Sequence, residues 1–335
     1  MKRTIVFRCL PAVAAVAALM STPAPEKRWY KGNLHTHTLR SDGDSSPEDV
    51  AAWYKQHDYR FLVLSDHNVL TAVGELNAAM GVKEQFLLMP GEEVTSAFEK
   101  RPVHINAYNL SRLVDPLKGE SLVETIQKNV DAIRAAKALP SVNHPNFHWA
   151  MTSAELLAVD NLQMFEVYNG HPQVHNSGGG GSESLEQMWD ALLSAGRKIY
   201  GIAVDDAHHF KIIDKQKSNP GRGWVVVRAS ELSTNAIAGA IEAGEFYASN
   251  GVELSDVEAG KKDLRIVIKP LGDTKYTTRF IGQGGKVLGE SFELSPSYTM
   301  RGDEKYVRAV VRASNGDEAW VQPVFPQRGP TGPLL

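Results

Sequence analysis

The stretch NLHTHTLRSDG at residues 33–43 contains two histidines two positions apart and, five positions after the second, an aspartate. Alternate residues of a strand point to the same side, so we expect His35 and His37 to reach one cation from a strand over residues 34–36. Asp42 adds a carboxylate to this pair. A His-x-His pair alone is weak evidence, because such pairs are also found on surfaces and in cores, so the rest of the chain has to supply further ligands.

Further ligand residues border other short apolar segments. Strands are expected over residues 61–65, 86–89, 103–108, 141–143, 164–167 and 199–204, with amphipathic helices between some of them. This alternation predicts βα units around a parallel sheet or barrel. Side chains at the carboxyl ends of such strands meet at one mouth. The candidates there are Asp66, His67, Glu92, Glu93, His104, His144, Asp205, Asp206 and His208.

Helix signals and a change of period divide the chain. Ser46 and Pro47 begin a helix that should end near residue 57, and apolar residues at helical spacing predict helices over residues 122–133 and 185–193. Four glycines at residues 178–181 predict a mobile loop. After Gly251 the apolar pattern has period two, so we expect a catalytic barrel over residues 25–250 and a small, β-sandwich-like all-β domain over residues 251–335.

The first 24 residues have the layout of a secretory signal peptide. Basic residues precede an apolar run over residues 10–20, and small residues follow it, so cleavage is expected between residues 18 and 24. The run is too short to span a bilayer of roughly 30 Å, which disfavours an uncleaved anchor. Cys9 is the only cysteine, so the exported protein needs neither disulfides nor thiolate ligands. We therefore expect a periplasmic or secreted protein.

Composition favours a small-molecule partner. The 335 residues have a formal net charge of −3, and removal of the basic leader makes the charge more negative. The chain has no excess of basic residues that would favour binding to nucleic acid, and we expect no membrane contact after the signal peptide is cleaved. All eleven histidines lie between His35 and His209, which places the chemistry in the first two thirds of the chain. The oligomeric state is left open by the sequence.

The ordered motifs at residues 33–38, 41–43, 65–68, 91–93, 143–145 and 206–208 resemble those of the PHP (polymerase and histidinol phosphatase) superfamily of metallohydrolases. The Asn-Gly segment at residues 169–170 is similar to an exported branch that includes carbaryl-hydrolase-like proteins. The resemblance covers residues 33 to about 250 and implies a distorted (β/α)7 barrel with two or three divalent ions. It implies a first ion on His35, His37, Glu93 and Asp206, a second on Glu93 (bridging), His104 and His144, and a third on Asp42, His67 and His208. Glu92 and Asp205 stay open as alternatives, although the family spacings favour their neighbours.

The ligand types agree with this resemblance on chemical grounds. Mixed imidazole and carboxylate ligands suit Zn²⁺, Mn²⁺ or Fe²⁺ better than Ca²⁺ or Mg²⁺. Two or three such ions lower the pKa of a bound water and clamp a substrate oxygen. The expected reaction is hydrolysis by a metal-activated hydroxide, with Glu93 as the central catalytic carboxylate.

Other residues near the expected mouth have open roles. Asp66 could orient a ligand, handle a proton or cap a turn, and His148 and His209 could act as general acids or be polar rim residues. Arg40 and Lys211 could clamp a phosphate or face solvent. His171 and His175 precede the four glycines and are candidates for substrate contact.

Three functions follow, in order of preference. The first is a metal-dependent phosphoesterase acting on a small phosphate mono- or diester, because most PHP enzymes cleave phosphorus–oxygen bonds. The second is a carbamate, ester or amide hydrolase with the same metal centre. The third is a non-catalytic metal- or glycan-binding protein, against which six intact motifs argue.

Overall fold

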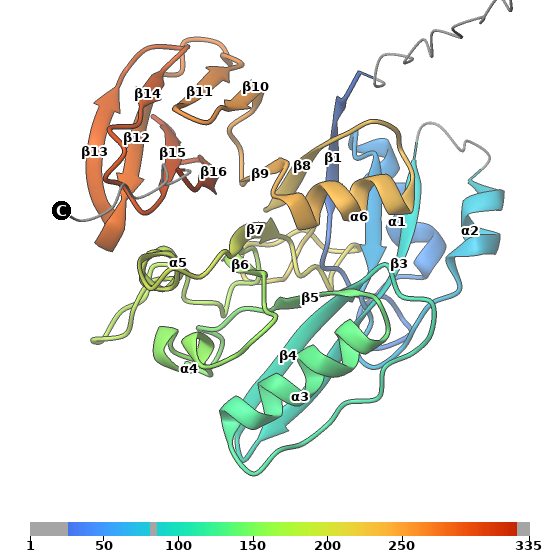
Figure 1. The fold of residues 1–335 in the computed structure, drawn as a ribbon. Coiled ribbons are helices and arrows are strands. Elements are labelled where there is room, and N and C mark those ends of the chain that lie inside the picture. The colour runs from blue at the N-terminus through green and yellow to red at the C-terminus, as the bar shows by residue number, and fades with distance from the viewer. Residues whose placement is uncertain (1–25, 81–85, 327–335) are drawn as a thin grey trace, which may run out of the picture.

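The computed structural model describes residues 26–80 and 86–326. They form a mixed α/β fold around a large curved sheet, with the C-terminal strands gathered on one side (Figure 1). The helices are α1 (Pro47–Gln56), α2 (Val73–Ala79), α3 (Leu122–Ala135), α4 (Ser153–Leu157), α5 (Leu185–Ser194) and α6 (Thr234–Ala243). The strands are β1 (Arg28–Asn33), β2 (Phe61–Leu64), β3 (Leu87–Phe98), β4 (Arg101–Tyr108), β5 (Leu139–Val142), β6 (Met164–Asn169), β7 (Tyr200–Val204), β8 (Trp224–Ala229), β9 (Phe246–Ser249), β10 (Leu254–Ala259), β11 (Asp263–Ile268), β12 (Tyr276–Gly282), β13 (Lys286–Ser291), β14 (Ser297–Thr299), β15 (Val307–Ala313) and β16 (Glu318–Val324).

The sheet mixes parallel and antiparallel pairs, which differs from the all-parallel arrangement expected. Its order is β13-β12-β15-β16-β9-β8-β1-β2-β3-β4-β5-β6-β7. β1, β2 and β3 run parallel, as do β5, β6 and β7, but β4 is antiparallel to both of its neighbours. Only two residues, Glu99 and Lys100, join β3 to β4, and so short a connection forces an antiparallel hairpin. Among the described strands β7 and β8 share no ladder, so a closed (β/α)7 barrel is not seen.

Two strands end at other places than the sequence predicts. β1 ends at Asn33, so that His35 and His37 follow the strand instead of lying in it. The Asn33 side chain explains this end, because its oxygen accepts from the His35 N–H (2.8 Å) and its amide donates to the Gly223 carbonyl (2.8 Å). These bonds take the place of the next rungs of the ladder. β3 continues to Phe98, which places Glu93 within the strand and not at its end.

The C-terminal strands continue the large sheet. β16 pairs antiparallel with β9, whereas β10, β11 and β14 form a separate three-stranded sheet. We expected a separate β-sandwich, whereas the pairing of β16 with β9 joins the C-terminal strands to the large sheet. Arg308 of β15 is fully buried and makes a bidentate contact with Asp190 of α5 (2.8 and 2.7 Å), which fixes α5 against the C-terminal strands. The boundary near residue 250 lies between β9 and β10 and stays a prediction.

The expected helices form where their caps and apolar faces predict them. Ser46 accepts from the Asp49 N–H at the start of α1, and α3 and α5 bury the apolar faces that the sequence shows. Figure 1 shows α3 lying along the β3–β4 hairpin. Within the described residues no helix is both long and apolar enough to cross a membrane. The expected signal peptide lies outside these residues.

Candidate metal centre

Nine imidazole and carboxylate side chains meet at one edge of the sheet. Among the described residues, four overlapping groups of such side chains place their ligand atoms within 4.8 Å of one another. The first two thirds of the chain supplies every member, and the C-terminal strands supply none. The members are the nine ligands expected from the sequence: His35, His37, Asp42, His67, Glu93, His104, His144, Asp206 and His208.

The innermost group has the spacing of a tetrahedral metal site. The two Nε2 atoms of His35 and His37 are 3.1 Å apart, and each lies 3.2 Å from Asp206 Oδ1. Glu93 Oε2 lies 3.5 and 3.4 Å from the same two nitrogens. Ligand atoms at about 2.0–2.2 Å from a tetrahedral ion are about 3.3–3.6 Å apart. The separations here, from 3.1 to 3.5 Å, are close to that range, so these four side chains could surround one divalent ion after small shifts.

Glu93 presents its two oxygens to different groups. Oε2 faces the innermost group and also lies 2.8 Å from His67 Nδ1, whereas Oε1 lies 3.0 Å from His104 Nδ1 and 3.5 Å from His144 Nε2. The side chain is fully buried, and in the described part of the chain the short contacts of Glu93 Oε2 and His104 Nδ1 do not have the geometry of hydrogen bonds. Such buried atoms are rare without a partner, so their arrangement fits a carboxylate that bridges two ions.

A third group lies nearer the solvent. Asp42 Oδ2 is 3.5 Å from His67 Nε2 and 3.4 Å from His208 Nε2, and the Asp42 side chain is 54% exposed. The His37 ring stacks on the His208 ring with centroids 4.1 Å apart, which joins this group to the innermost one. The third group is thus open to solvent on the Asp42 side.

The cluster is strongly coupled electrostatically. Burial alone would raise the pKa of Glu93, but the imidazoles of His104 and His35 outweigh it and hold that pKa well below its usual range. Burial would lower the pKa of His67, yet Glu93 and Asp42 raise it to about 10. Burial and the neighbouring His208 lower the pKa of His37 to about 3, which leaves that ring neutral and able to bind a cation.

Glu166 is a functional residue that the sequence analysis missed. Its Oε1 lies 2.6 Å from His35 Nδ1, and its Oε2 accepts from the His144 N–H (2.7 Å) and from the Asn169 amide (2.8 Å). Through these bonds Glu166 orients the His35 ring from behind and holds the backbone at His144. The signal was a single acidic residue inside the apolar strand β6, where an unpaired charge is costly.

Glu166→Gln should weaken metal binding about 10- to 100-fold, because the amide no longer holds the His35 ring in one tautomer. Competition with a chromophoric chelator measures this affinity. Glu92→Gln is the matched control, because Glu92 is also a buried glutamate of the sheet. It lies next to Glu93 on β3 but accepts a hydrogen bond from the Val114 N–H instead of contacting a member of the cluster. Equal affinities of the wild type and Glu166→Gln would contradict the positioning role.

Three other acidic candidates lie outside the four groups. Asp66 is fully buried and accepts from the Thr38 N–H (2.7 Å) and the Ser41 hydroxyl (2.8 Å), so it holds the loop that carries His37. Burial raises the pKa of Glu92 to about 7. Asp205 accepts from the Tyr54 hydroxyl (2.7 Å), which places it behind the cluster. The structure thus brings Glu93 and Asp206 into the cluster, and not their neighbours.

The remaining candidates lie at different distances from the cluster. The His171 ring is 5.7 Å from the His208 ring, and His209 is 6.5 Å from it. His148 is exposed and lines a hollow together with His104. His175 is exposed and stacks on Trp149 at 4.5 Å. Arg40 and Lys211 are both exposed. Their backbone N–H groups donate hydrogen bonds to the side chains of Thr38 and Asp44, respectively.

The strands and the cluster together define an α/β protein with groups of side chains that could hold metal ions. No model of a protein family matches the chain. A solved structure from Bacteroides vulgatus, of a two-domain protein containing a predicted PHP-like metal-dependent phosphoesterase, has a similar fold, with a TM-score of 0.51, 16% identity, and 95% of this chain and 98% of that chain covered. A putative metal-dependent phosphoesterase from Bifidobacterium adolescentis has a TM-score of 0.41 and 14% identity over 56% of this chain and 89% of that chain.

One curated protein is similar in sequence. The 5'-3' exoribonuclease Rnm of Escherichia coli K12 is 26% identical over 187 residues, which cover 53% of this chain. The chain spans 61% of the length of that relative. The fold is therefore similar to that of the Bacteroides vulgatus protein, and the cluster offers ligands for divalent metal ions. The exported, carbaryl-hydrolase-like branch stays a prediction.

Proposed function

We propose that this protein is a metal-dependent phosphoesterase that hydrolyses a phosphate mono- or diester. The observation that carries the proposal is Glu93, whose two oxygens face two different groups of imidazoles within one buried cluster. A pair of ions that shares one carboxylate suits displacement at phosphorus, because it can stabilise the attacking and the leaving oxygen together. The PHP-like neighbour and the exoribonuclease relative support phosphoester over carbamate cleavage.

The donor set favours borderline divalent ions. Six imidazoles and three carboxylates form the cluster, which suits Zn²⁺, Mn²⁺ or Fe²⁺. When bound, such ions supply Lewis acidity toward a phosphoryl oxygen and offset its charge. His35, His37, Glu93 and Asp206 would hold the first ion, and Glu93, His104 and His144 the second. We propose Asp42, His67 and His208 for a third ion on the solvent side.

Other side chains orient the site and can hold a proton. Asn143 donates to Glu93 Oε1 (2.8 Å) and fixes the carboxylate plane. His171 Nδ1 accepts from the Gln173 N–H (3.2 Å), so the proton of a neutral ring is on Nε2. From the mouth of the cluster, this Nε2–H is placed to donate to a leaving oxygen.

Substrate size and cellular location are further parts of the proposal. The composition argues for a small substrate and against nucleic acid, whereas the exoribonuclease relative argues for a phosphodiester of a nucleic acid. A short phosphodiester satisfies both observations. We also propose export through the signal peptide at residues 1–24.

A panel of nitrophenyl esters tests the proposed reaction. We expect the metal-loaded protein to hydrolyse 4-nitrophenyl phosphate or bis(4-nitrophenyl) phosphate, and to hydrolyse 4-nitrophenyl acetate and an aryl carbamate far more slowly. Asp206→Asn, purified in parallel, measures activity from contaminants, because it removes a ligand of the innermost group. Turnover of the carbamate or acetate without turnover of either phosphoester would reject the proposal.

A further inference from the structure

A hollow of about 500 Å³ opens directly beside the metal centre. His104, a member of the cluster, forms part of its lining, together with Phe147, His148, Lys100, Lys118 and Glu99. Its volume is within the range of about 300–1,000 Å³ that small-molecule sites occupy. A substrate whose scissile group lies at His104 can therefore extend into this hollow.

Hydrogen bonds fix both walls of the hollow. Arg101, at the start of β4, donates from Nε to the Ala150 carbonyl (2.7 Å), which ties the hairpin turn to the loop that carries His148. On the opposite wall, the Leu117 carbonyl accepts from Ser96 Oγ (2.8 Å) and from the Asn129 amide (2.8 Å). The backbone next to Lys100 and Lys118 is thus held in place, whereas both lysine side chains extend into solvent.

The charge in the hollow favours an anion. Lys100 and Lys118 are both exposed, and within the described part of the chain neither ammonium has a hydrogen-bond or ion-pair partner. Glu99 is the single carboxylate of the lining, so the two ammonium groups leave a positive excess. Unpaired cations beside a metal centre are suited to an anionic group of the substrate.

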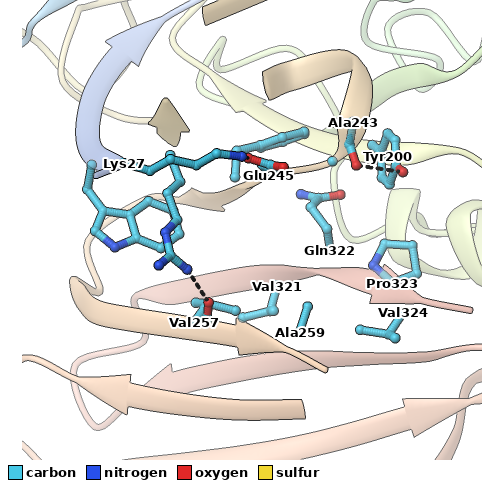
Figure 2. A pocket seen from close by; sticks show the side chains of 14 residues that line it. Lys27, Tyr200, Ala243, Glu245, Val257, Ala259, Val321, Gln322, Pro323 and Val324 are labelled. Carbon is cyan, nitrogen blue, oxygen red and sulfur yellow. Dashed lines mark hydrogen bonds and ion pairs between the residues drawn. The ribbon is translucent and has the colours of Figure 1, made fainter. Parts of the chain in front are cut away.

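A second large cavity lacks this feature. It has a volume of about 520 Å³ and lies between β1, β9 and β16, away from the cluster (Figure 2). There Lys27 pairs with Glu245, and Arg228 donates to the Val257 carbonyl (3.4 Å). Its cations already have partners, so the hollow beside His104 is the better anion site.

We propose that Lys100 and Lys118 form a second anion subsite, which selects phosphoesters that carry another negative charge a few bonds from the scissile phosphorus. The proposal rests on the proposed phosphoesterase function and names its substrate class. Phe147 and His148 also line the hollow, where they would contact the linking part of such a substrate.

Two synthetic diesters test the subsite. 4-Nitrophenyl butyl phosphate and 4-nitrophenyl 3-carboxypropyl phosphate have chains of similar length, but only the second ends in a carboxylate. For the wild type we expect a KM about five- to twentyfold lower for the carboxylate, with similar kcat. Lys100→Ala and Lys118→Ala should each remove about two- to fivefold of this preference. Glu99→Gln should increase the preference, because it removes the opposing charge.

Lys261→Ala, an exposed lysine in the turn between β10 and β11, is the matched control and should leave both KM values unchanged. Equal KM values for the two diesters in the wild type, or an unchanged preference in both lysine variants, would overturn the subsite. If neither diester is hydrolysed, the phosphoesterase proposal fails, and calorimetric binding of the diesters to the metal-loaded protein still tests the subsite. A tighter complex with the carboxylate that is lost in Lys118→Ala supports the subsite, and equal binding rejects it.

Discussion

Glu93→Gln should abolish phosphoester hydrolysis, with a loss of more than about 10³-fold in kcat/KM. An amide keeps the size of the side chain but has one oxygen and no charge, so it can serve only one of the two groups that Glu93 faces. The variant should also lose at least one bound ion per chain. Initial rates with bis(4-nitrophenyl) phosphate and metal analysis of the same sample measure both effects.

Glu92→Gln is again the control, because it makes the same chemical change one residue away on the other face of β3. This variant should keep both its activity and its ions. If turnover survived in metal-loaded Glu93→Gln, a bridging role for Glu93 would be wrong, and the cluster would have to be interpreted as structural.

Removal of the ions should have the second largest effect. Dialysis against a chelator should eliminate activity and lower the free energy of unfolding by about 4 kcal/mol for each ion that was present at a thousand times its Kd. The buried carboxylates of Glu93 and Asp206 lose their cationic partners on removal, so the folded state is penalised. Calorimetry with and without added Zn²⁺ or Mn²⁺ measures the change in Tm. Asp206→Asn should respond less, and a wild type whose activity resists chelation would contradict the metal mechanism.

Most residues of the cluster could be predicted from the sequence because they lie in short local motifs, although His104 has none and was placed only by its position at a strand. His35 and His37 are two positions apart, and Asp206 and His208 repeat that spacing after a buried strand. Motifs of this kind require no knowledge of which strands are neighbours. The residue at which β1 ends was harder to predict, because it depends on a contact between Asn33 and Gly223, 190 residues away in the chain.

Residues that act through tertiary contacts could not be predicted. Glu166 has no motif of its own and becomes informative only when β6 places it behind His35. Lys100 and Lys118 are separated in sequence, and only the β3–β4 hairpin and its neighbouring loop bring them to one hollow. The pairing of β16 with β9 is likewise a long-range event, which the period-two pattern of each strand does not encode.

The most direct test of the metal centre is anomalous diffraction from crystals of the protein grown with Zn²⁺ or Mn²⁺. The account predicts at least two anomalous peaks, one about 2.0–2.3 Å from His35 Nε2, His37 Nε2 and Asp206, and one at a similar distance from His104 and His144, with Glu93 contacting both. A single peak that Glu93 does not contact, or no peak among these side chains in an active, metal-loaded protein, would contradict it.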